Sequence, residues 1–217
     1  MSDYASRRMT MVDTQVRPSD VTKFPIIDAM LHIPREVYIP LESREAAYVG
    51  SNIDLGAGRV VLDPRALAKL LDALDIGPDE LVLDLGSALG YSAAVLARIA
   101  GTVVAVEENK DLADEAQRIL SQEGVDNAVV VEGKLAEGAA KHGLYDVIVV
   151  EGGIEVLPEA VAAQLKDGGR IGAIFMEGAL GTVRIGLKVD GRIDWRDAFH
   201  ATAPVLPGFE KKKSFAL

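Results

Sequence analysis

The sequence predicts an α/β fold: a mostly parallel sheet with a C-terminal antiparallel hairpin and an N-terminal helical extension. From Leu81 onward, short apolar runs alternate with segments of helical periodicity, and this alternation places helices on both faces of a parallel sheet. Near the end of the chain, Asp190-Gly191 separates two strand-like runs, a pair that favours a tight hairpin turn. We therefore predict a single domain over residues 1–217, with 1–80 as the extension and 81–217 as the α/β core.

Two helices are predicted in the extension. The first is Val21–Leu31, with Asp20 as its N-cap. The second is Pro64–Leu74, in which Asp63 takes the capping position, proline is the first helical residue and leucines recur on one face. Between these helices, residues 46–58 have the composition of a loop.

The core is predicted to alternate strands with helices. The strands are Leu81–Leu85, Thr102–Val106, Ala128–Glu132, Tyr145–Val150, Arg170–Phe175, Val183–Val189 and Arg192–Phe199. The helices lie near Ser92–Ile99, Asp111–Glu123, Leu135–Lys141 and Pro158–Leu165.

Acidic and small residues stand where the first two core strands end. Asp84 closes the first strand, Gly86 and Gly90 flank a turn that contains Ser87, and Glu107 ends the second strand. In an open parallel sheet the ligand binds beyond the carboxyl ends of the strands. Glycine allows the backbone to approach a ligand, and a carboxylate at the end of the second strand accepts hydrogen bonds from two ribose hydroxyls. The pattern predicts a nucleoside site in 81–217, although small residues in such a turn also serve packing alone.

Two further loops are predicted to reach the same crevice. Gly133–Leu135 follows the third strand and Glu151–Gly153 follows the fourth, so both lie at the carboxyl edge of the sheet. We expect Lys134, Leu135 and Glu151 to contribute to the cofactor site.

The glycine pattern separates the possible nucleotides. A dinucleotide site has G-x-G-x-x-G after the strand, but the three positions here are Gly86, Ala88 and Tyr91. Ala88 blocks the closest approach of a pyrophosphate and Tyr91 is too large for tight helix–strand contact, so an NAD-binding oxidoreductase is disfavoured. No G-x-x-x-x-G-K-[ST] phosphate loop occurs. A ligand with ribose and adenine but no phosphate remains, which describes S-adenosylmethionine.

Composition narrows the partners and the compartment. The net charge of −10 disfavours nucleic acid as a partner, and no apolar run approaches the roughly 20 residues that span a bilayer. The absence of cysteine excludes disulfides, thiolate metal ligands and cysteine nucleophiles. We expect a cytoplasmic protein with no metal site and no nucleic-acid or membrane partner, and the sequence leaves the oligomeric state open.

Over roughly residues 11–174 the sequence resembles the protein-L-isoaspartate O-methyltransferase family. MVDTQV…IIDAMLHIPREVYIP is similar to the family's MV..Q start and AM..(V/I)PRE.(F/Y)(V/I)P signature, AAYVGSNIDLGAGR to its AY…IG.G loop, and VLDLGSALGYSAAVLA to its VLEIGTGSGYQAAVLA. The resemblance implies the methyltransferase α/β sheet, S-adenosylmethionine as cofactor and methyl transfer to a carboxylate or other acceptor. That acceptor is a protein, a peptide or a small molecule.

Three departures from the family pattern bear on the site. Where the family has T-I-S-x-P, whose serine lines the active site, this chain has VVLDP, so Leu62 replaces the hydroxyl and Asp63 adds a negative charge. By resemblance these two residues take the catalytic positions, with a plain helix cap as the alternative for Asp63. Where the family has G-D-G, whose aspartate meets the adenine amine, this chain has GKL, and Lys134 offers no acceptor. Ala88 stands for the glycine in the middle of the nucleoside loop.

Two functions remain open from the sequence. One is a working O-methyltransferase. It is favoured by four residues that have no reason to occur together without a ligand: Asp84, Gly86, Gly90 and Glu107. The other is a non-catalytic or weakly active descendant that acts as a binding or scaffold protein, which Leu62 and Lys134 favour. We expect weak or undetectable methylation of isoaspartyl peptides.

Overall fold

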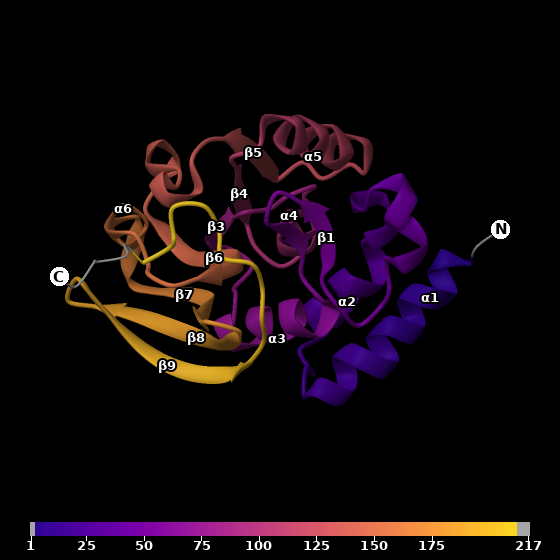
Figure 1. The fold of residues 1–217 in the computed structure, drawn as a ribbon, viewed down its shortest axis with the longest axis horizontal. Coiled ribbons are helices and arrows are strands. Elements are labelled where there is room, and N and C mark those ends of the chain that lie inside the picture. The colour runs from indigo at the N-terminus through magenta and orange to yellow at the C-terminus, as the bar shows by residue number, and fades with distance from the viewer. Residues whose placement is uncertain (1–2, 212–217) are drawn as a thin grey trace.

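A seven-stranded sheet forms the centre of the molecule (Figure 1). The computed structural model describes residues 3–211. The strands of this sheet are β3 (Leu81–Leu85), β4 (Thr102–Glu107), β5 (Ala128–Glu132), β6 (Tyr145–Ile154), β7 (Leu165–Glu177), β8 (Leu180–Val189) and β9 (Arg192–His200). Their spatial order is β5-β4-β3-β6-β7-β8-β9. The strands from β5 to β7 in this order are parallel, whereas β8 and β9 pair antiparallel, so the predicted fold class is confirmed.

The hairpin turn between β8 and β9 is confirmed at its predicted residues. Asp190 and Gly191 have φ values of 50° and 77°, in the left-handed region that aspartate and glycine adopt at low cost. β6 and β7 both run beyond their predicted ends, and β7 also begins earlier, at Leu165.

Helices cover both faces of the sheet. The α-helices among the described residues are α1 (Tyr4–Met11), α2 (Phe24–His32), α3 (Pro64–Leu74), α4 (Tyr91–Ala97), α5 (Lys110–Gln122) and α6 (Glu159–Ala163). The prediction for α3 is confirmed at both ends. Asp63 caps it, because its carboxylate accepts a hydrogen bond from the Ala66 N–H at 2.9 Å.

The predicted start of α2 is wrong. Asp20 has a φ of 66° and ends a preceding 3-10 turn, so its side chain does not cap the helix. The chain then extends through Lys23, and the helix begins at Phe24 with Pro25 in its first turn, where proline's fixed φ suits a helix start.

Two other local predictions are also wrong. Residues 46–58, expected as a loop, contain β1 (Ile53–Gly56), which pairs with β2 (Arg59–Val61) in a separate two-stranded sheet. The helix predicted over Leu135–Lys141 is instead two short 3-10 turns. Gly138, with a φ of 62°, leaves the helical region between them.

Two apolar cores lie on the two faces of the sheet. Side chains alternate along each strand, so Val82 joins one core and Leu83 the other. The first core includes Met11 and Met30 from the extension, and this continuity fits one domain, which stays a prediction. No helix in the described part of the chain is long and apolar enough to cross a membrane.

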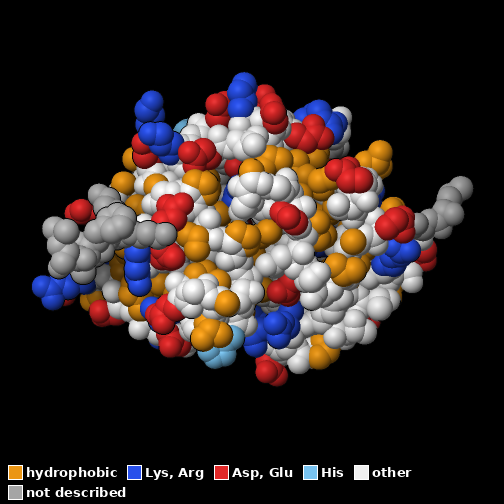
Figure 2. All heavy atoms as spheres, in the orientation of Figure 1, with side chains coloured by type: hydrophobic (Ala, Val, Ile, Leu, Met, Phe, Trp, Pro, Cys, Tyr) orange, Lys and Arg blue, Asp and Glu red, His pale blue; other side chains and the backbone are white. Residues whose placement is uncertain are grey.

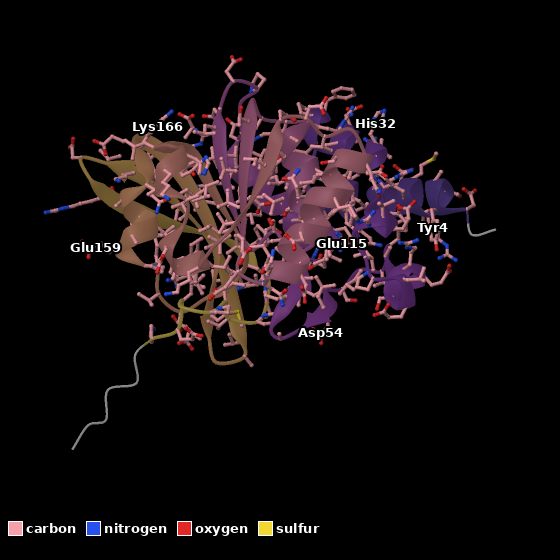
Figure 3. The ribbon with its side chains drawn as sticks, turned by 90° about the horizontal axis from the view of Figure 1, so that it is seen from above. Tyr4, His32, Asp54, Glu115, Glu159 and Lys166 are labelled. Carbon is pink, nitrogen blue, oxygen red and sulfur yellow. The ribbon has the colours of Figure 1, made fainter. Side chains whose placement is uncertain are left out.

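The segment after β9 crosses the carboxyl ends of the strands (Figure 1, yellow). The Gly153 N–H donates to the Pro204 carbonyl at 2.8 Å, and the Leu206 N–H donates to the Gly153 carbonyl at 2.9 Å. Leu206 therefore packs onto the end of β6, where a Cβ added to Gly152 would lie 2.5 Å from its side chain. Seen from above, Asp54 on β1 lies at the lower side of the molecule and Lys166, near the start of β7, at the upper side (Figure 3).

Candidate functional site

Asp84 lies at the carboxyl end of β3 and is fully buried. Its Oδ2 accepts a hydrogen bond from the Ser92 hydroxyl at 2.7 Å, whereas Oδ1 has no partner among the described residues. Burial raises the pKa of Asp84 to about 7, against the opposing effects of the Ser92 hydrogen bond and the Arg59 charge. This carboxyl group is therefore partly protonated near neutral pH and keeps one oxygen available to a polar group.

The turn after β3 has the left-handed backbone that glycine favours. Gly86, Ala88 and Gly90 have φ values of 85°, 51° and 90°. Gly86 faces the crevice, because an added Cβ would lie 2.8 Å from Arg59 Nη2. Gly90 faces α5, where an added Cβ would lie 3.4 Å from that of Ala116. Of the two predicted glycines, Gly86 alone borders the space beyond β3.

Glu107 ends β4, and both of its carboxylate oxygens are engaged. Oε2 accepts hydrogen bonds from Arg59 Nη2 at 2.7 Å and from the Ala88 N–H at 2.9 Å. Oε1 accepts from the Asn109 N–H at 3.0 Å and from Arg59 Nε at 3.3 Å. The side chains of Arg59 and Glu107 are 4% and 0% exposed, so this ion pair is closed to water. Because a carboxylate offers about four acceptor positions, none is left for ribose hydroxyls in this conformation.

Sequence reasoning missed Arg59. It is the first residue of β2, in a region expected to be loop up to its neighbour Gly58. Nothing in its local sequence links it to Glu107. The one indication in the sequence is that Arg59 lies between a glycine and the apolar run Val60–Val61. In the structure all three residues of β2 are buried, and a buried arginine needs an anionic partner because an unpaired buried charge is very costly.

A second buried arginine, also missed, fixes the floor of the crevice. Arg35 Nε donates to the Ala47 carbonyl at 2.7 Å, and Nη2 donates to the Leu62 carbonyl at 2.6 Å. Its guanidinium lies 4.7 Å from the centre of the Tyr91 ring, a cation–π contact. Arg35 thus holds Leu62 and its backbone next to the end of β3.

The space beyond β3 is almost filled. The cavity bordered by Leu62, Gly86, Ser87 and Glu151 has a volume of about 10 Å³, which is room for about one water molecule. Ser87 Oγ and Glu151 Oε1 have no partner in the described part of the chain. Burial, with the nearby Asp84 charge, raises the pKa of Glu151 well above its usual range. A nucleoside therefore does not fit this conformation, although Gly86, Ser87 and Glu151, three of the residues predicted to hold it, border the space.

Lys134 and Leu135 do not join this group of residues. The Lys134 side chain is 70% exposed and its Nζ lies 3.3 Å from Glu137 Oε1. Leu135 is fully buried within the second apolar core. The structure therefore directs the lysine toward solvent rather than into the cavity.

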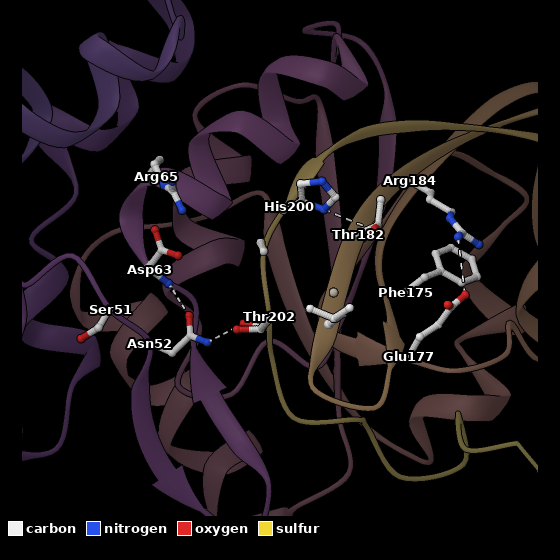
Figure 4. Close-up of a pocket in the computed structure, with 13 residues that line it drawn as sticks. Ser51, Asn52, Asp63, Arg65, Phe175, Glu177, Thr182, Arg184, His200 and Thr202 are labelled. Atoms are coloured by element: carbon white, nitrogen blue, oxygen red, sulfur yellow. Dashed lines mark hydrogen bonds and ion pairs between the residues drawn. The ribbon is translucent and has the colours of Figure 1, made fainter.

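Leu62 borders the small cavity, and the next residue, Asp63, borders a larger groove (Figure 4). The groove has a volume of about 550 Å³ and runs between the start of α3, the turn that joins β7 to β8, and the segment after β9. Asp63 borders the groove while it caps α3, and its own N–H donates to Asn52 Oδ1 at 2.8 Å. The cap role is therefore confirmed, and the carboxylate also faces the groove.

The fold and the acid–glycine arrangement at the ends of β3 and β4 define a methyltransferase of the S-adenosylmethionine-dependent class. The family model for protein-L-isoaspartate(D-aspartate) O-methyltransferase (PCMT) matches residues 7–176. The chain belongs to this family. Among residues 3–211, no cluster of His, Asp and Glu is suited to a metal ion.

Curated relatives and solved structures agree with this assignment. Protein-L-isoaspartate O-methyltransferase 1 of Rhodopseudomonas palustris is 36% identical over 170 residues, covering 78% of this chain and 69% of the relative. The Syntrophus aciditrophicus protein-L-isoaspartate O-methyltransferase is 34% identical over 171 residues, covering 79% of this chain and 78% of the relative. A solved protein-L-isoaspartate O-methyltransferase has a TM-score of 0.81 at 25% identity, with 93% of this chain matched to 66% of that one.

A second solved structure supports the fold alone. It is a Plasmodium falciparum protein described as a putative protein-L-isoaspartate O-methyltransferase in complex with S-adenosyl-L-homocysteine. Its TM-score is 0.78 at 19% identity, and the match covers 95% of this chain and 99% of that one.

Proposed function

We propose that this chain transfers a methyl group from S-adenosylmethionine to the carboxylate of an isoaspartyl residue in proteins or peptides. The observation that carries the proposal is the position of Leu62 and Asp63. Leu62 borders the small buried cavity at the end of β3, and Asp63, the next residue, borders the open groove. In a family of protein methyltransferases, this arrangement fits a donor site and an acceptor site that meet at one point.

The groove has the chemistry of a peptide site. Arg65 and Arg184 border it, as do Asp63 and Glu177 (Figure 4). Arg184 pairs with Asp197 at 3.0 Å, whereas no ion pair involves Arg65 within residues 3–211. Arg65 is exposed, so its positive charge is free to attract an acceptor carboxylate into the groove. The negative charge of Asp63, which borders the same groove, opposes the final approach of that carboxylate. Elsewhere on this face of the molecule, acidic and basic side chains are interspersed (Figure 2).

A carboxylate acceptor limits what the protein has to supply. It is already ionised near neutral pH, so it attacks a methyl group without a general base. The contribution of the chain is to align the acceptor oxygen and to exclude water. Leu62, buried at 1% exposure, suits exclusion of water but provides no hydroxyl to orient the acceptor.

Transfer of radiolabelled methyl groups to an isoaspartyl peptide tests the proposal, with the matching aspartyl peptide as control. We expect slow transfer to the isoaspartyl peptide and background transfer to the control. Leu62→Ser should raise the rate by restoring a hydroxyl. Asp63→Ser keeps a capping oxygen and removes a charge whose repulsion of a carboxylate at about 4 Å is roughly 1–4 kcal/mol at dielectric constants of 80 to 20, so it should raise the rate by one to three decades. Failure of all three proteins to label the isoaspartyl peptide would contradict the proposed acceptor.

A specific observation also favours the second candidate, a binding or scaffold protein without catalysis. The nucleoside space is filled in this conformation, and Glu107 is fully bonded. Binding of S-adenosylhomocysteine without any methyl transfer would support this candidate over the first. The cofactor roles of Asp84, Gly86, Ser87, Gly90, Glu107, Lys134, Leu135 and Glu151 stay proposals, as does a cytoplasmic location.

A further inference from the structure

The guanidinium of Arg59 fills the position in which a ribose would meet Glu107. It comes from β2, outside the seven-stranded sheet, and its side chain is 4% exposed. A Cβ added to Gly86 would lie 2.8 Å from Arg59 Nη2. Arg59 therefore occupies the space beyond β3 that is open because residue 86 is glycine.

Arg59 is the exchangeable partner of Glu107. The other two donors, the N–H groups of Ala88 and Asn109, belong to the turns that hold the carboxylate in place. Arg59 comes from a hairpin 48 residues earlier in the chain. A ligand hydroxyl that approaches Glu107 has to replace the two Arg59 hydrogen bonds and leave the backbone pair intact.

The pair is strong, yet its surroundings are incompletely bonded. Arg59 Nη1, Asp84 Oδ1, Ser87 Oγ and Glu151 Oε1 all lack partners within residues 3–211. Ser87 and Glu151 line the small cavity, and the charges of Arg59 and Asp84 act on each other and on Glu151. Buried polar groups are normally satisfied, so these neighbouring unpaired atoms indicate a place for a polar ligand. The Arg59 guanidinium fills this space but forms no hydrogen bond with the unpaired oxygens of Asp84, Ser87 and Glu151.

The tip of the hairpin that carries Arg59 is open, whereas Val60 and Val61 of β2 are buried in the first apolar core. The tip contains Gly56, Ala57 and Gly58, with φ values of 81°, 50° and 73°. A Cβ added to either glycine would meet no atom within 4 Å, so the tip is unpacked. β1 and β2 pair with each other and not with the seven-stranded sheet. Withdrawal of the Arg59 side chain therefore breaks no hydrogen bond of that sheet.

We propose that Arg59 is a specificity-determining residue that competes with the ribose of the cofactor for Glu107, so that the cofactor binds only after Arg59 leaves the crevice. This inference rests on the proposed function, because it concerns the same cofactor. The proposal adds that Arg59 lowers the affinity of the protein for every nucleoside whose ribose binds Glu107. The size of the decrease depends on this one side chain.

Calorimetric titration with S-adenosylhomocysteine tests the inference on the full chain. We expect Arg59→Gln, which keeps a polar side chain beside Glu107, to bind at least tenfold more tightly than the unmodified protein. Arg170→Gln is the matched control. It weakens a comparable bidentate pair, in which Arg170 lies 2.7 and 2.8 Å from the Glu80 oxygens at the other end of the sheet. Its affinity for the ligand should be unchanged.

The outcomes separate this inference from the proposed function. Equal affinity of Arg59→Gln and the unmodified protein would overturn the role of Arg59 while the cofactor assignment stands. No binding by either protein at millimolar ligand would overturn the cofactor assignment, and the role of Arg59 with it. If Arg59→Gln unfolds, Arg59→Lys takes its place: it keeps the charge but loses the fork that engages both carboxylate oxygens, and a tightening of at least threefold is expected.

Discussion

The two ends of the sheet each hold an arginine–glutamate pair, and the pairs differ in how completely they are bonded. At the amino end, Arg170 and Glu80 are each 23% exposed. Arg170 also donates to the carbonyls of Leu74 and Asp75, at 2.9 and 2.8 Å. At the carboxyl end, Arg59 is more deeply buried, yet its Nη1 lacks a partner in the described part of the chain.

This difference separates a pair that links two elements of the fold from a pair that fills the proposed cofactor site. A pair whose donors all find acceptors stabilises the contact between α3 and β7 and needs no ligand. A deeper pair beside unpaired atoms of Asp84, Ser87 and Glu151 carries desolvation cost without full compensation. Unpaired polar atoms gather where an open α/β sheet binds its ligands, and the amino end has no equivalent among the residues named.

The largest expected effect on stability comes from breaking each pair at its acid. Glu107→Ala leaves the Arg59 guanidinium buried without a counter-charge, so the free energy of unfolding should fall by about 3–5 kcal/mol. Glu80→Ala leaves Arg170 partly solvated and still bonded to two carbonyls, so the loss should be about 1–2 kcal/mol. Urea unfolding monitored by circular dichroism measures both. Equal losses would mean that burial does not distinguish the two ends.

The pH dependence of stability should have opposite signs at the two ends. Burial raises the pKa of Asp84 to about 7, so the folded protein binds this proton more tightly than the unfolded chain. The resulting stability is fully present below the unfolded pKa, near 4, and is lost as the pH rises through about 7. The hydrogen bond from Arg170 lowers the pKa of Glu80, so that contribution is present above the unfolded pKa and is lost as the pH falls.

Urea titrations between pH 4 and pH 8 test this contrast. The unmodified protein should lose on the order of 2–4 kcal/mol of unfolding free energy between pH 4 and pH 8 through deprotonation of Asp84. Asp84→Asn should remove this loss, because an amide does not titrate. Glu80→Gln should leave the high-pH limb unchanged in shape. A variant of Asp84 with the same pH curve as the unmodified protein would show that this carboxyl group does not titrate in the range.

The strands of the sheet could be predicted from the sequence, whereas the contacts inside the candidate site could not. Strands such as β3 and β5 matched their predicted bounds because each is a continuous apolar run between turn residues, although β3 is buried and β5 lies at the exposed edge of the sheet. Asp63 was identified as a cap because capping is local. Glu107 was located by its distance from the glycine turn, a local relation within one strand–helix–strand unit.

Arg59, Arg35 and the direction of Lys134 were beyond local patterns. Arg59 meets Glu107 across 48 residues, and Arg35 reaches the Leu62 carbonyl across 27. Such contacts depend on how the extension folds over the core, which no periodicity encodes. Lys134 was aligned to a family position, but an alignment assigns a place in the chain and not the direction of a side chain, and this one turns toward Glu137.

The smallest expected effect concerns backbone strain, which both ends carry at similar φ. Ala88, at the carboxyl end, has a φ of 51°, and Asp190, in the hairpin turn at the amino end, has a φ of 50°. Glycine relieves about 1 kcal/mol of left-handed strain at an alanine. It also frees the unfolded chain by about 0.4–1 kcal/mol, and it removes a methyl group whose burial is worth about 0.8 kcal/mol.

These terms nearly cancel, so Ala88→Gly should change the free energy of unfolding by less than about 1 kcal/mol. Asp190→Gly should also change it by less than about 1 kcal/mol, because an exposed aspartate tolerates this conformation and has little strain to lose. Thermal unfolding of the two variants side by side measures the difference. A gain above about 1.5 kcal/mol at Ala88 alone would exceed what relief of ordinary left-handed strain provides. That result would locate additional strain in the turn after β3, on the same side of the sheet as the incompletely bonded Arg59.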